Sequence, residues 1–599
     1  MSEDVEHAFD DLCQQLEDAG AEAAPQVKRV LDLLDDELDR VRAAVATGHE
    51  VHEEDAFNFM AAATRLVADL ADPANDREAK NSPDAEGWAA ADKAELDALD
   101  AMDCFELEER SVMRAAGFHP QPTKILRRYK GNYLGILEKL KSRLVVLGNC
   151  MRQGMDYHET FASTLMLVAF RAIWQIAVPT GERVTGCDIG NAFINAENEE
   201  TTYIEQIPGF EKADPKRFVL RLKKCLYGMP HAPRAFKRKM DLVLSDMGFK
   251  RLVTDQCVYI KVDDDTGDRI VVANYVDDGV IMTNNEAMRE EYKAGLKKAF
   301  HKVKFFDNVD GILGVAVRQG VDDDGLRYVE LNQHKAIVDV AKVAGVEGTR
   351  AVATPMGTDK LEKYEGPPVD GPGWQFSSVL GATMYIANVT RPDVLTSVNQ
   401  LAKFSKNPGP AHYKALKRVV QYMYHTRELA LTLRQSRDHP LRIGAAADSS
   451  FADDVNTRRS TMGWAMWLGG STTGAVAFAS RVGKSIAYST THAEVNALHE
   501  MQKDIVWMRA FMEELGYAQP GSTRVFEDNN GCIGQVMASK GMRKARQYPT
   551  QLAGLQELVH GGVIHLRRVD SNDNIADALS KPLQGDAFRK HARALLGLK

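Results

Sequence analysis

One group of acidic residues could perform metal-assisted chemistry in the first half of the chain. Asp188 ends a short β-prone stretch, and the adjacent pair Asp277–Asp278 lies between two apolar runs. Carboxylates gathered closely repel one another, and divalent cations relieve that repulsion. Two Mg²⁺ ions about 3.5–4 Å apart would activate a hydroxyl nucleophile and stabilise charge on a leaving group. The alternative is a plain hairpin turn, because Asp and Gly favour turns.

A second group of acids follows the order strand end, helix, strand end, helix. Its members are Asp448, Glu494, Asp528 and Asp577. Each acid also has a structural explanation. Glu494 fits a capping box with Thr491, Asp528 or Asn529 would cap the next helix, and Asp577 suits a first helical turn. The order of all four is harder to explain by these local roles, so the sequence predicts a second acidic site.

The elements that must position these acids alternate without a regular βαβ rhythm, which favours an α+β fold. Strands are expected at 217–222, 257–262 and 269–276, and a helix at 233–248. A Pro/Gly-rich break at 365–373 precedes helices over 376–435. From 440 to 577 strands come first and helices after. The clearest helix spans 489–516, where apolar residues recur every three or four positions, at Leu498, Met501, Ile505, Met508, Met512 and Leu515.

The net charge of −9 hides an asymmetry along the chain. Residues 1–120 hold 31 acidic and 10 basic residues, a net of −21, whereas the remainder carries +12. Helices are expected within 1–47, 54–71 and 93–117, with a linker at 71–87. This segment is interpreted as an acidic helical or partly disordered extension, with an oligomerisation or regulatory arm as the alternative. The basic remainder suits a polyanionic partner.

Composition narrows the class of protein further. No run of 18 apolar residues exists, so no membrane span is expected, and the acidic N-terminus lacks the apolar core of a signal peptide. The seven cysteines form no CxxC pair, which argues against a zinc site or a disulfide framework. A reducing, intracellular compartment fits best. No GxxxxGK[ST] motif supports a nucleotide-binding P-loop.

Extended stretches of the chain resemble the copia-type LTR retrotransposon Pol polyproteins, over about residues 140–585. The resemblance in the first half is carried by KSRLVVLGNCMRQGMDYHETF (141–161), CDIGNAFINAENEETTYIEQIPGF (187–210), LKKCLYGMPHAPRAF (222–236) and NYVDDGVIMTNN (274–285). In the second half it is carried by ADSSFADDVNTRRSTMGWAMWLGG (447–470), AYSTTHAEVNAL (487–498), EDNNGCI (527–533) and NIADALSKPL (574–583). The resemblance implies the reverse transcriptase plus RNase H region of such a transposable element.

The resemblance also implies roles for individual residues of the polymerase half. Asp188, Asp277 and Asp278 would hold two Mg²⁺ ions. Phe193 would crowd a ribose 2′-hydroxyl and so select dNTPs, with a core aromatic as the alternative. Lys141 and Arg143 would pair with the incoming triphosphate, with a solvated basic face as the alternative. Tyr227 and Gly228 match the lining of the nucleotide pocket, although Tyr227 could equally be a packing residue.

In the RNase H half, the resemblance makes Asp448, Glu494, Asp528 and Asp577 the ligands of two further Mg²⁺ ions, with Mn²⁺ as a substitute. Arg458 and Arg459 would contact phosphates of the hybrid. One departure concerns RKARQYPTQLAGLQE (543–557), which lacks the family's histidines and contains a proline. Such a change would slow product release or mark a decaying copy.

Five segments are therefore expected. They are the acidic extension (1–120), fingers and palm (121–320), thumb and connection (321–436), an α/β RNase H-like domain (437–585) and a C-terminal tail (586–599). The implied function is RNA-directed DNA synthesis from a primer with cleavage of RNA in RNA–DNA hybrids. The implied partners are RNA template, DNA primer, hybrid and dNTPs, with an oligomer through the extension. The expected location is cytoplasmic, in virus-like particles, or nuclear. The alternative is a catalytically decayed descendant that binds nucleic acid or protein.

Overall fold

The computed structural model describes residues 70–131, 137–437, 441–538 and 547–599. These residues belong to two compact units. The first comprises Met1–Ala162 with Ala192–Arg238, and the second comprises Ser163–Asn191 with Lys239–Lys599. The helices expected within 1–47 and 54–69 lie outside the described residues. No helix among the described residues is both long enough and apolar enough to cross a membrane.

The first unit contains two small sheets. Strands β1 (Phe105–Glu109), β6 (Phe218–Leu222) and β5 (Tyr203–Ile204) form an antiparallel sheet in the order β1-β6-β5. Strands β2 (Thr123–Gly131) and β3 (Leu137–Val146) form a hairpin. The helices are α4 (Asp76–Lys80), α5 (Ala85–Ala101), α6 (Arg110–Ala115) and the first part of α8 (Ala232–Asp246). Their shared core includes Leu99, Ile204, Leu220 and Leu226.

The described part of the acidic extension differs from its prediction. The expected linker at 71–87 contains α4 and the start of α5, and the expected helix at 93–117 ends at Ala101. Residues 105–109 instead form β1, because Phe105 and Leu107 pair with Leu222 and Leu220 of β6. That pairing joins segments more than 100 residues apart, so local helical spacing could not reveal it.

Acidic residues of this segment contact the basic β2–β3 hairpin. The Arg127 guanidinium is buried and forms ion pairs with Asp92 and, at 2.8 Å, with Asp76. The Tyr129 hydroxyl donates to Asp84 at 2.7 Å, and its ring packs edge-on against Trp88 at 4.9 Å. The charge contrast seen in the sequence is therefore partly satisfied within the first unit.

A six-stranded antiparallel sheet begins the second unit. Its order is β11-β4-β10-β9-β8-β7. The strands are β4 (Arg183–Ile189), β7 (Lys250–Arg251), β8 (Val258–Val262), β9 (Arg269–Tyr275), β10 (Asp278–Thr283) and β11 (Val303–Phe306). Helix α7 (Leu167–Thr180) precedes β4, and α9 (Glu286–Ala299) follows β10. The strands and the helix expected at 217–222, 257–262, 269–276 and 233–248 are confirmed within a few residues.

A second sheet and a group of helices follow. Strands β12 (Gly311–Ile312), β13 (Val315–Val321), β14 (Arg327–Asn332) and β15 (Leu431–Arg434) pair in that order. Between β14 and β15 lie α10 (His334–Ala344), α11 (Phe376–Val389), α12 (Leu395–Ala402) and α13 (Pro410–His425). Helices α11, α12 and α13 confirm the helical character expected from residue 376 as far as His425, whereas residues 431–434 of the expected helical range form strand β15.

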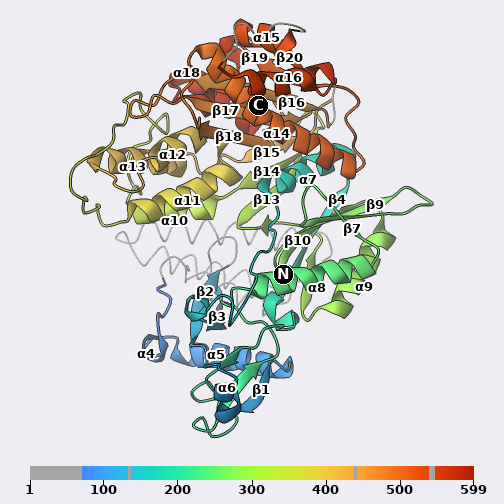
Figure 1. The fold of residues 1–599 in the computed structure, drawn as a ribbon, viewed down its shortest axis with the longest axis vertical. Helices are drawn as coiled ribbons and strands as arrows, with labels where there is room; N and C mark the ends of the chain where they lie inside the picture. The colour runs from blue at the N-terminus through green and yellow to red at the C-terminus, as the bar shows by residue number, and fades with distance from the viewer. Residues whose placement is uncertain (1–69, 132–136, 438–440, 539–546) are drawn as a thin grey trace, which may run out of the picture. The chain divides into compact units, whose positions relative to one another are not determined.

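The C-terminal sheet has the order β18-β17-β16-β19-β20 (Figure 1). Strands β16 (Ile443–Ser450), β17 (Thr461–Leu468) and β18 (Ala477–Val482) are antiparallel, whereas β19 (Thr523–Glu527) and β20 (Ile564–Arg568) run parallel to β16. Its helices are α14 (Thr490–Glu514), α15 (Asn530–Met537), α16 (Pro549–His560), α17 (Asp577–Ser580) and α18 (Gly585–Leu596).

The two faces of this sheet are covered by different helices. Ala445 and Ala447 pack with the apolar stripe of α14, whereas Ala446 packs with α17 and α18. All six apolar residues predicted for the 489–516 helix are buried, as their spacing indicated. Residues 586–599 do not form a tail, because α18 buries Phe588, Leu595 and Leu596 in this core.

Candidate active sites

The β9–β10 hairpin brings the first group of acids to one row of the six-stranded sheet. Asp278 begins β10 and lies directly opposite Asp188 of β4 in the antiparallel register. Directly opposed side chains on neighbouring strands project to the same face, with Cβ atoms about 4.5–5.5 Å apart. Asp277 lies in the adjoining turn, and its carbonyl accepts a 2.9 Å hydrogen bond from the Ile189 N–H. The hairpin turn and the acidic group thus coexist.

The turn itself is strained. Tyr275 pairs with Asp278, so the loop consists of Val276 and Asp277, and Val276 has a φ of 55°. A β-branched residue rarely adopts the left-handed region, and doing so costs on the order of 1–3 kcal/mol. Strain of this kind persists only where surrounding structure enforces it. Here the strained turn fixes the positions of the adjacent Asp277 and Asp278 carboxylates.

Three of the candidate nucleotide-binding residues meet in the first unit. The Phe193 and Tyr227 rings lie edge to face with centroids 5.0 Å apart, and the Arg143 guanidinium lies 4.5 Å from the Tyr227 centroid. The Tyr227 carbonyl accepts from the Val146 N–H of β3 at 2.9 Å, which fixes the turn containing Gly228. Lys141 lies on β3, two residues before Arg143.

The second group of acids is far more compact. Asp448, Glu494 and Asp528 each offer a carboxylate oxygen, and the three oxygens lie within 4.8 Å of one another. Asp448 and Glu494 are only 3% and 5% exposed. Among the residues that the structure describes, this is the acidic trio already gathered closely enough to share one cation. The backbone pairs Asp188 with Asp278, but their set forms no comparable trio.

The capping alternatives for these acids are decided by hydrogen bonds. Helix α14 is capped by Ser489, whose side chain accepts from the His492 N–H at 3.1 Å, so Glu494 is not the partner in a capping box. Helix α15 is capped by Asn529, which leaves Asp528 free of that role. Asp577 does begin α17, as expected. Glu494 therefore has no capping explanation for its burial.

Burial and the charge of neighbouring carboxylates raise the pKa values of Glu494 and Asp577. Burial and the neighbouring carboxylate of Glu527 raise the pKa of Glu494 well above its usual range. Burial and the charge of Asp448 raise the pKa of Asp577 to about 7. The side-chain oxygen Glu494 Oε2 has no hydrogen-bond partner within the described residues. Carboxylates in this state are suited to a divalent cation, which would supply the missing interactions.

A cation from the protein already enters this cluster. The Lys581 Nζ lies 3.0 Å from Asp577 Oδ1 and 3.6 Å from Asp448 Oδ2, and the Ser580 hydroxyl donates to Asp448. Burial alone would lower the pKa of Lys581, but the charges of Asp448 and Asp577 raise it overall. Asp577 is thus linked to the trio through Asp448 and Lys581.

Sequence reasoning missed Lys581, Ser580 and a fifth buried carboxylate, Glu527. Glu527 is fully buried, burial raises its pKa to about 8, and its Oε2 has no hydrogen-bond partner within the described residues. The alternation of buried Thr523, Val525 and Glu527 along β19 was the available signal, because it directs Glu527 to the face covered by α14.

The two candidate arginines lie at one end of the C-terminal sheet. Arg458 and Arg459 are exposed in the loop between β16 and β17, the loop that follows Asp448. In the stretch that departs from the family pattern, residues 539–546 lie outside the described residues. Pro549 is not inside a helix but at the first position of α16, where its missing N–H costs no hydrogen bond.

A family model and several known sequences are similar to this chain. Residues 110–358 match the family model described as "Reverse transcriptase (RNA-dependent DNA polymerase)". The "Retrovirus-related Pol polyprotein from transposon TNT 1-94" of Nicotiana tabacum is 28% identical over 529 residues. That match covers 87% of this chain but only 39% of the relative, so the chain spans about two fifths of that protein's length.

Two solved structures match the chain with low TM-scores and low sequence identity. A foamy viral protease-reverse transcriptase in complex with double-stranded DNA has a TM-score of 0.41 and 13% identity, covering 77% of this chain and 68% of that one. RNase H1 from Halobacterium salinarum has a TM-score of 0.18 and 18% identity, covering 23% of this chain and 94% of that one.

Proposed function

We infer that this chain synthesises DNA on an RNA template and also cleaves the RNA of RNA–DNA hybrids. The chain belongs to the copia-type Pol polyproteins of retrotransposons and carries a reverse transcriptase domain over residues 110–358. The observation that carries the second activity is the buried Asp448, Glu494 and Asp528 trio. Within the trio, the Oε2 atom of Glu494 without a hydrogen-bond partner and the raised pKa of Glu494 have no structural use that the fold reveals.

The cleavage site would hold Mg²⁺ through Asp448, Glu494, Asp528 and Asp577. When bound, the metal supplies a lowered pKa for an attacking water and charge stabilisation for the departing 3′-oxygen. The residues of the chain supply the position. Asp448 lies on β16, Asp528 directly follows the parallel neighbouring strand β19, and Glu494 is held by the first turns of α14. Lys581 keeps two of the carboxylates together without metal. The exposed Arg458 and Arg459 would contact the hybrid's phosphates.

The polymerase site would use Asp188, Asp277 and Asp278 for the same two-metal chemistry on a primer 3′-hydroxyl. The register of β4 and β10 holds two of the carboxylates side by side. Arg143, stacked on Tyr227, presents a cation suited to a triphosphate. Phe193, packed against the same ring, would exclude a ribose 2′-hydroxyl. Lys141 and Gly228 complete the proposed nucleotide pocket.

The proposal extends to the ligands, the cofactor, the functional boundaries, the assembly and the location of the chain. RNA template, DNA primer, hybrid and dNTPs are the proposed ligands, Mg²⁺ is the proposed cofactor, and Mn²⁺ its substitute. The functional boundaries into fingers, palm, thumb and RNase H-like regions, an oligomer through residues 1–120 and a cytoplasmic or nuclear location are predictions from the family resemblance.

The test separates the two sites in one protein. Primer extension on an RNA template with Mg²⁺ and dNTPs should fall at least about 100-fold in Asp277→Asn and stay unchanged in Glu494→Gln. Cleavage of a labelled RNA–DNA hybrid should show the reverse pattern. Asp573→Asn, which changes an exposed acid four residues before Asp577, is the control for charge removal. A wild-type chain that performs neither reaction would favour the decayed, binding-only alternative.

A further inference from the structure

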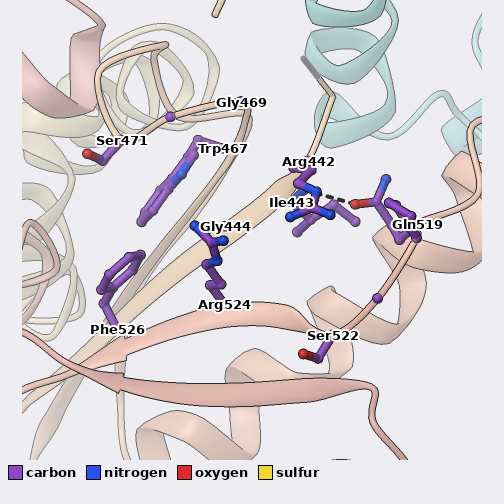
Figure 2. Close-up of a pocket in the computed structure, with 13 residues that line it drawn as sticks. Arg442, Ile443, Gly444, Trp467, Gly469, Ser471, Gln519, Ser522, Arg524 and Phe526 are labelled. Atoms are coloured by element: carbon purple, nitrogen blue, oxygen red, sulfur yellow. Dashed lines mark hydrogen bonds between the residues drawn. The ribbon is translucent and has the colours of Figure 1, made fainter. Parts of the chain in front are cut away.

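A separate hollow of about 150 Å³ opens at the end of the C-terminal sheet where β16 begins. Three segments form it: residues 442–444 at the start of β16, residues 469–471 after β17, and residues 519–522 before β19. Figure 2 shows Trp467 and Phe526 on one side of it and the two arginines, Arg442 and Arg524, on the other.

The walls of the hollow are held in place by hydrogen bonds. The Gln519 side chain accepts from the Ile443 N–H at 3.0 Å and donates to the Leu441 carbonyl at 3.1 Å, which fixes the loop before β19 against β16. The Arg509 guanidinium donates to the Gly521 carbonyl at 2.7 Å. The buried Thr473 hydroxyl donates to the Leu468 and Gly470 carbonyls. A hollow with fixed walls is pre-organised for a ligand.

An aromatic wall exists because β16 has a glycine, Gly444, near its start. Trp467, Gly444 and Arg524 occupy one row across β17, β16 and β19. A Cβ on Gly444 would lie 2.4 Å from Trp467 Nε1, so only glycine lets the indole lie across the strand. The Trp467 and Phe526 rings stack with centroids 6.0 Å apart and planes 24° apart. Together they present an aromatic edge to the hollow.

The charge of the hollow is positive. Arg442 and Arg524 are exposed, and no acidic residue lines the hollow. Neither guanidinium forms an ion pair or hydrogen bond within the described ranges of the chain. Arginine without an acidic partner beside an aromatic surface is the combination that recognises a phosphate joined to a planar ring. The hydroxyls of Ser471 and Ser522 lie at the rim as further donors.

The size of the hollow suits a single ring. A cavity of about 150 Å³ accommodates one benzene-sized ring, which is the size of a pyrimidine. The hollow is also distinct from the acid cluster. Gly444 and Asp448 are four residues apart along β16, so about 13 Å separates them at about 3.3 Å per residue.

We propose that this hollow binds one pyrimidine nucleotide unit, with the base against Trp467 and Phe526 and the phosphate on Arg442 and Arg524. The unit comes either from a free nucleotide or from an unpaired position of a nucleic-acid strand. The proposal goes beyond the two acidic sites and needs no metal ion.

The test uses the full chain in EDTA, where neither polymerisation nor cleavage proceeds. Two photoreactive probes are compared: 5-iodo-dUMP, and an oligodeoxythymidylate carrying one 5-iododeoxyuridine. After irradiation, mass spectrometry locates the crosslink. We expect it at Trp467 or Phe526. The Arg442→Gln/Arg524→Gln double variant, which changes exposed side chains only, should reduce the yield at least tenfold.

The control is a variant of an arginine that lies outside the hollow. Arg350→Gln removes the same charge from an exposed arginine that does not line the hollow and should leave the yield unchanged. Crosslinking by both probes identifies a free nucleotide as sufficient, and crosslinking by the strand alone identifies an unpaired position of a strand. Crosslinks that avoid both aromatic residues, or that survive the double variant undiminished, would overturn the proposal. Because the assay measures neither activity, its result is independent of the proposed function.

Discussion

Replacing Asp577 with asparagine should stabilise the metal-free protein. Asp577 is 8% exposed, and burial and Asp448 raise its pKa from 3.8 to about 7. Its folded state therefore binds a proton more tightly than the unfolded state. The unfolded chain loses the Asp577 proton at a lower pH than the folded chain does. The free energy of unfolding therefore falls as pH rises from about 4 to 7. Above pH 7 the carboxylate is ionised in both states, and the whole penalty is present.

The magnitude follows from the size of the pKa difference. Each tenfold change in acidity corresponds to about 1.4 kcal/mol, so ionised Asp577 costs up to about 4 kcal/mol at pH 8 and about 1–2 kcal/mol at pH 5. Asparagine at position 577 keeps the shape of the side chain and removes its charge. In EDTA, Asp577→Asn should therefore raise the free energy of unfolding at pH 8 by about 3 kcal/mol more than at pH 5.

Urea denaturation followed by tryptophan fluorescence measures this difference at the two pH values. Asp573→Asn is the matched control. Asp573 lies four residues earlier, pairs with Lys590, and that lysine lowers its pKa, so no gain at pH 8 is expected. Saturating Mg²⁺ should stabilise the wild type and remove the advantage of Asp577→Asn. A variant no more stable than wild type at pH 8 in EDTA would refute the account of repelling buried carboxylates.

Three further predictions concern substitutions of single residues. Val276→Asn should raise the free energy of unfolding by about 1 kcal/mol, because Asn tolerates the φ of 55° that strains valine; an unchanged denaturation midpoint would contradict the strain. Lys581→Gln should destabilise the protein in EDTA and increase the gain on adding Mg²⁺, because Asp448 and Asp577 lose their internal cation; calorimetric titration with Mg²⁺ checks this. Arg171→Leu should cost about 3 kcal/mol in urea denaturation, because its guanidinium satisfies the Val476, Asn388 and Val389 carbonyls; a neutral result would mean that water replaces it.

Local patterns predicted the features that depend on local physics. The three- and four-residue spacing of apolar side chains predicted helix α14, and all of those side chains are buried. The apolar runs flanking Asp277 and Asp278 predicted two strands and the turn between them. The acids of the C-terminal half were singled out because they fall at the ends of elements, and three of them meet.

Tertiary pairing decided the features that the patterns did not predict. Strand β1 exists because β6 offers it a partner, and residues 586–599 form a packed helix because the sheet has an uncovered face. Taken alone, Lys581 and Glu527 are charged residues of the kind usually found at a surface. Only the fold places both of them beside the carboxylates of the acidic cluster. The choice of Ser489 over Thr491 as helix cap likewise depends on where the chain enters α14.

Contacts within the second unit join its six-stranded sheet to its C-terminal sheet. Trp507 of α14 donates to the Thr254 carbonyl at 2.9 Å, Glu514 accepts from the Val253 N–H at 2.7 Å, and residues of both sheets share one apolar core. Under the proposed function, these contacts would hold the two groups of acids at a set separation. A duplex passing both would then be cut a set number of base pairs behind its growing end, so the protein itself would act as the ruler that fixes how much template stays attached.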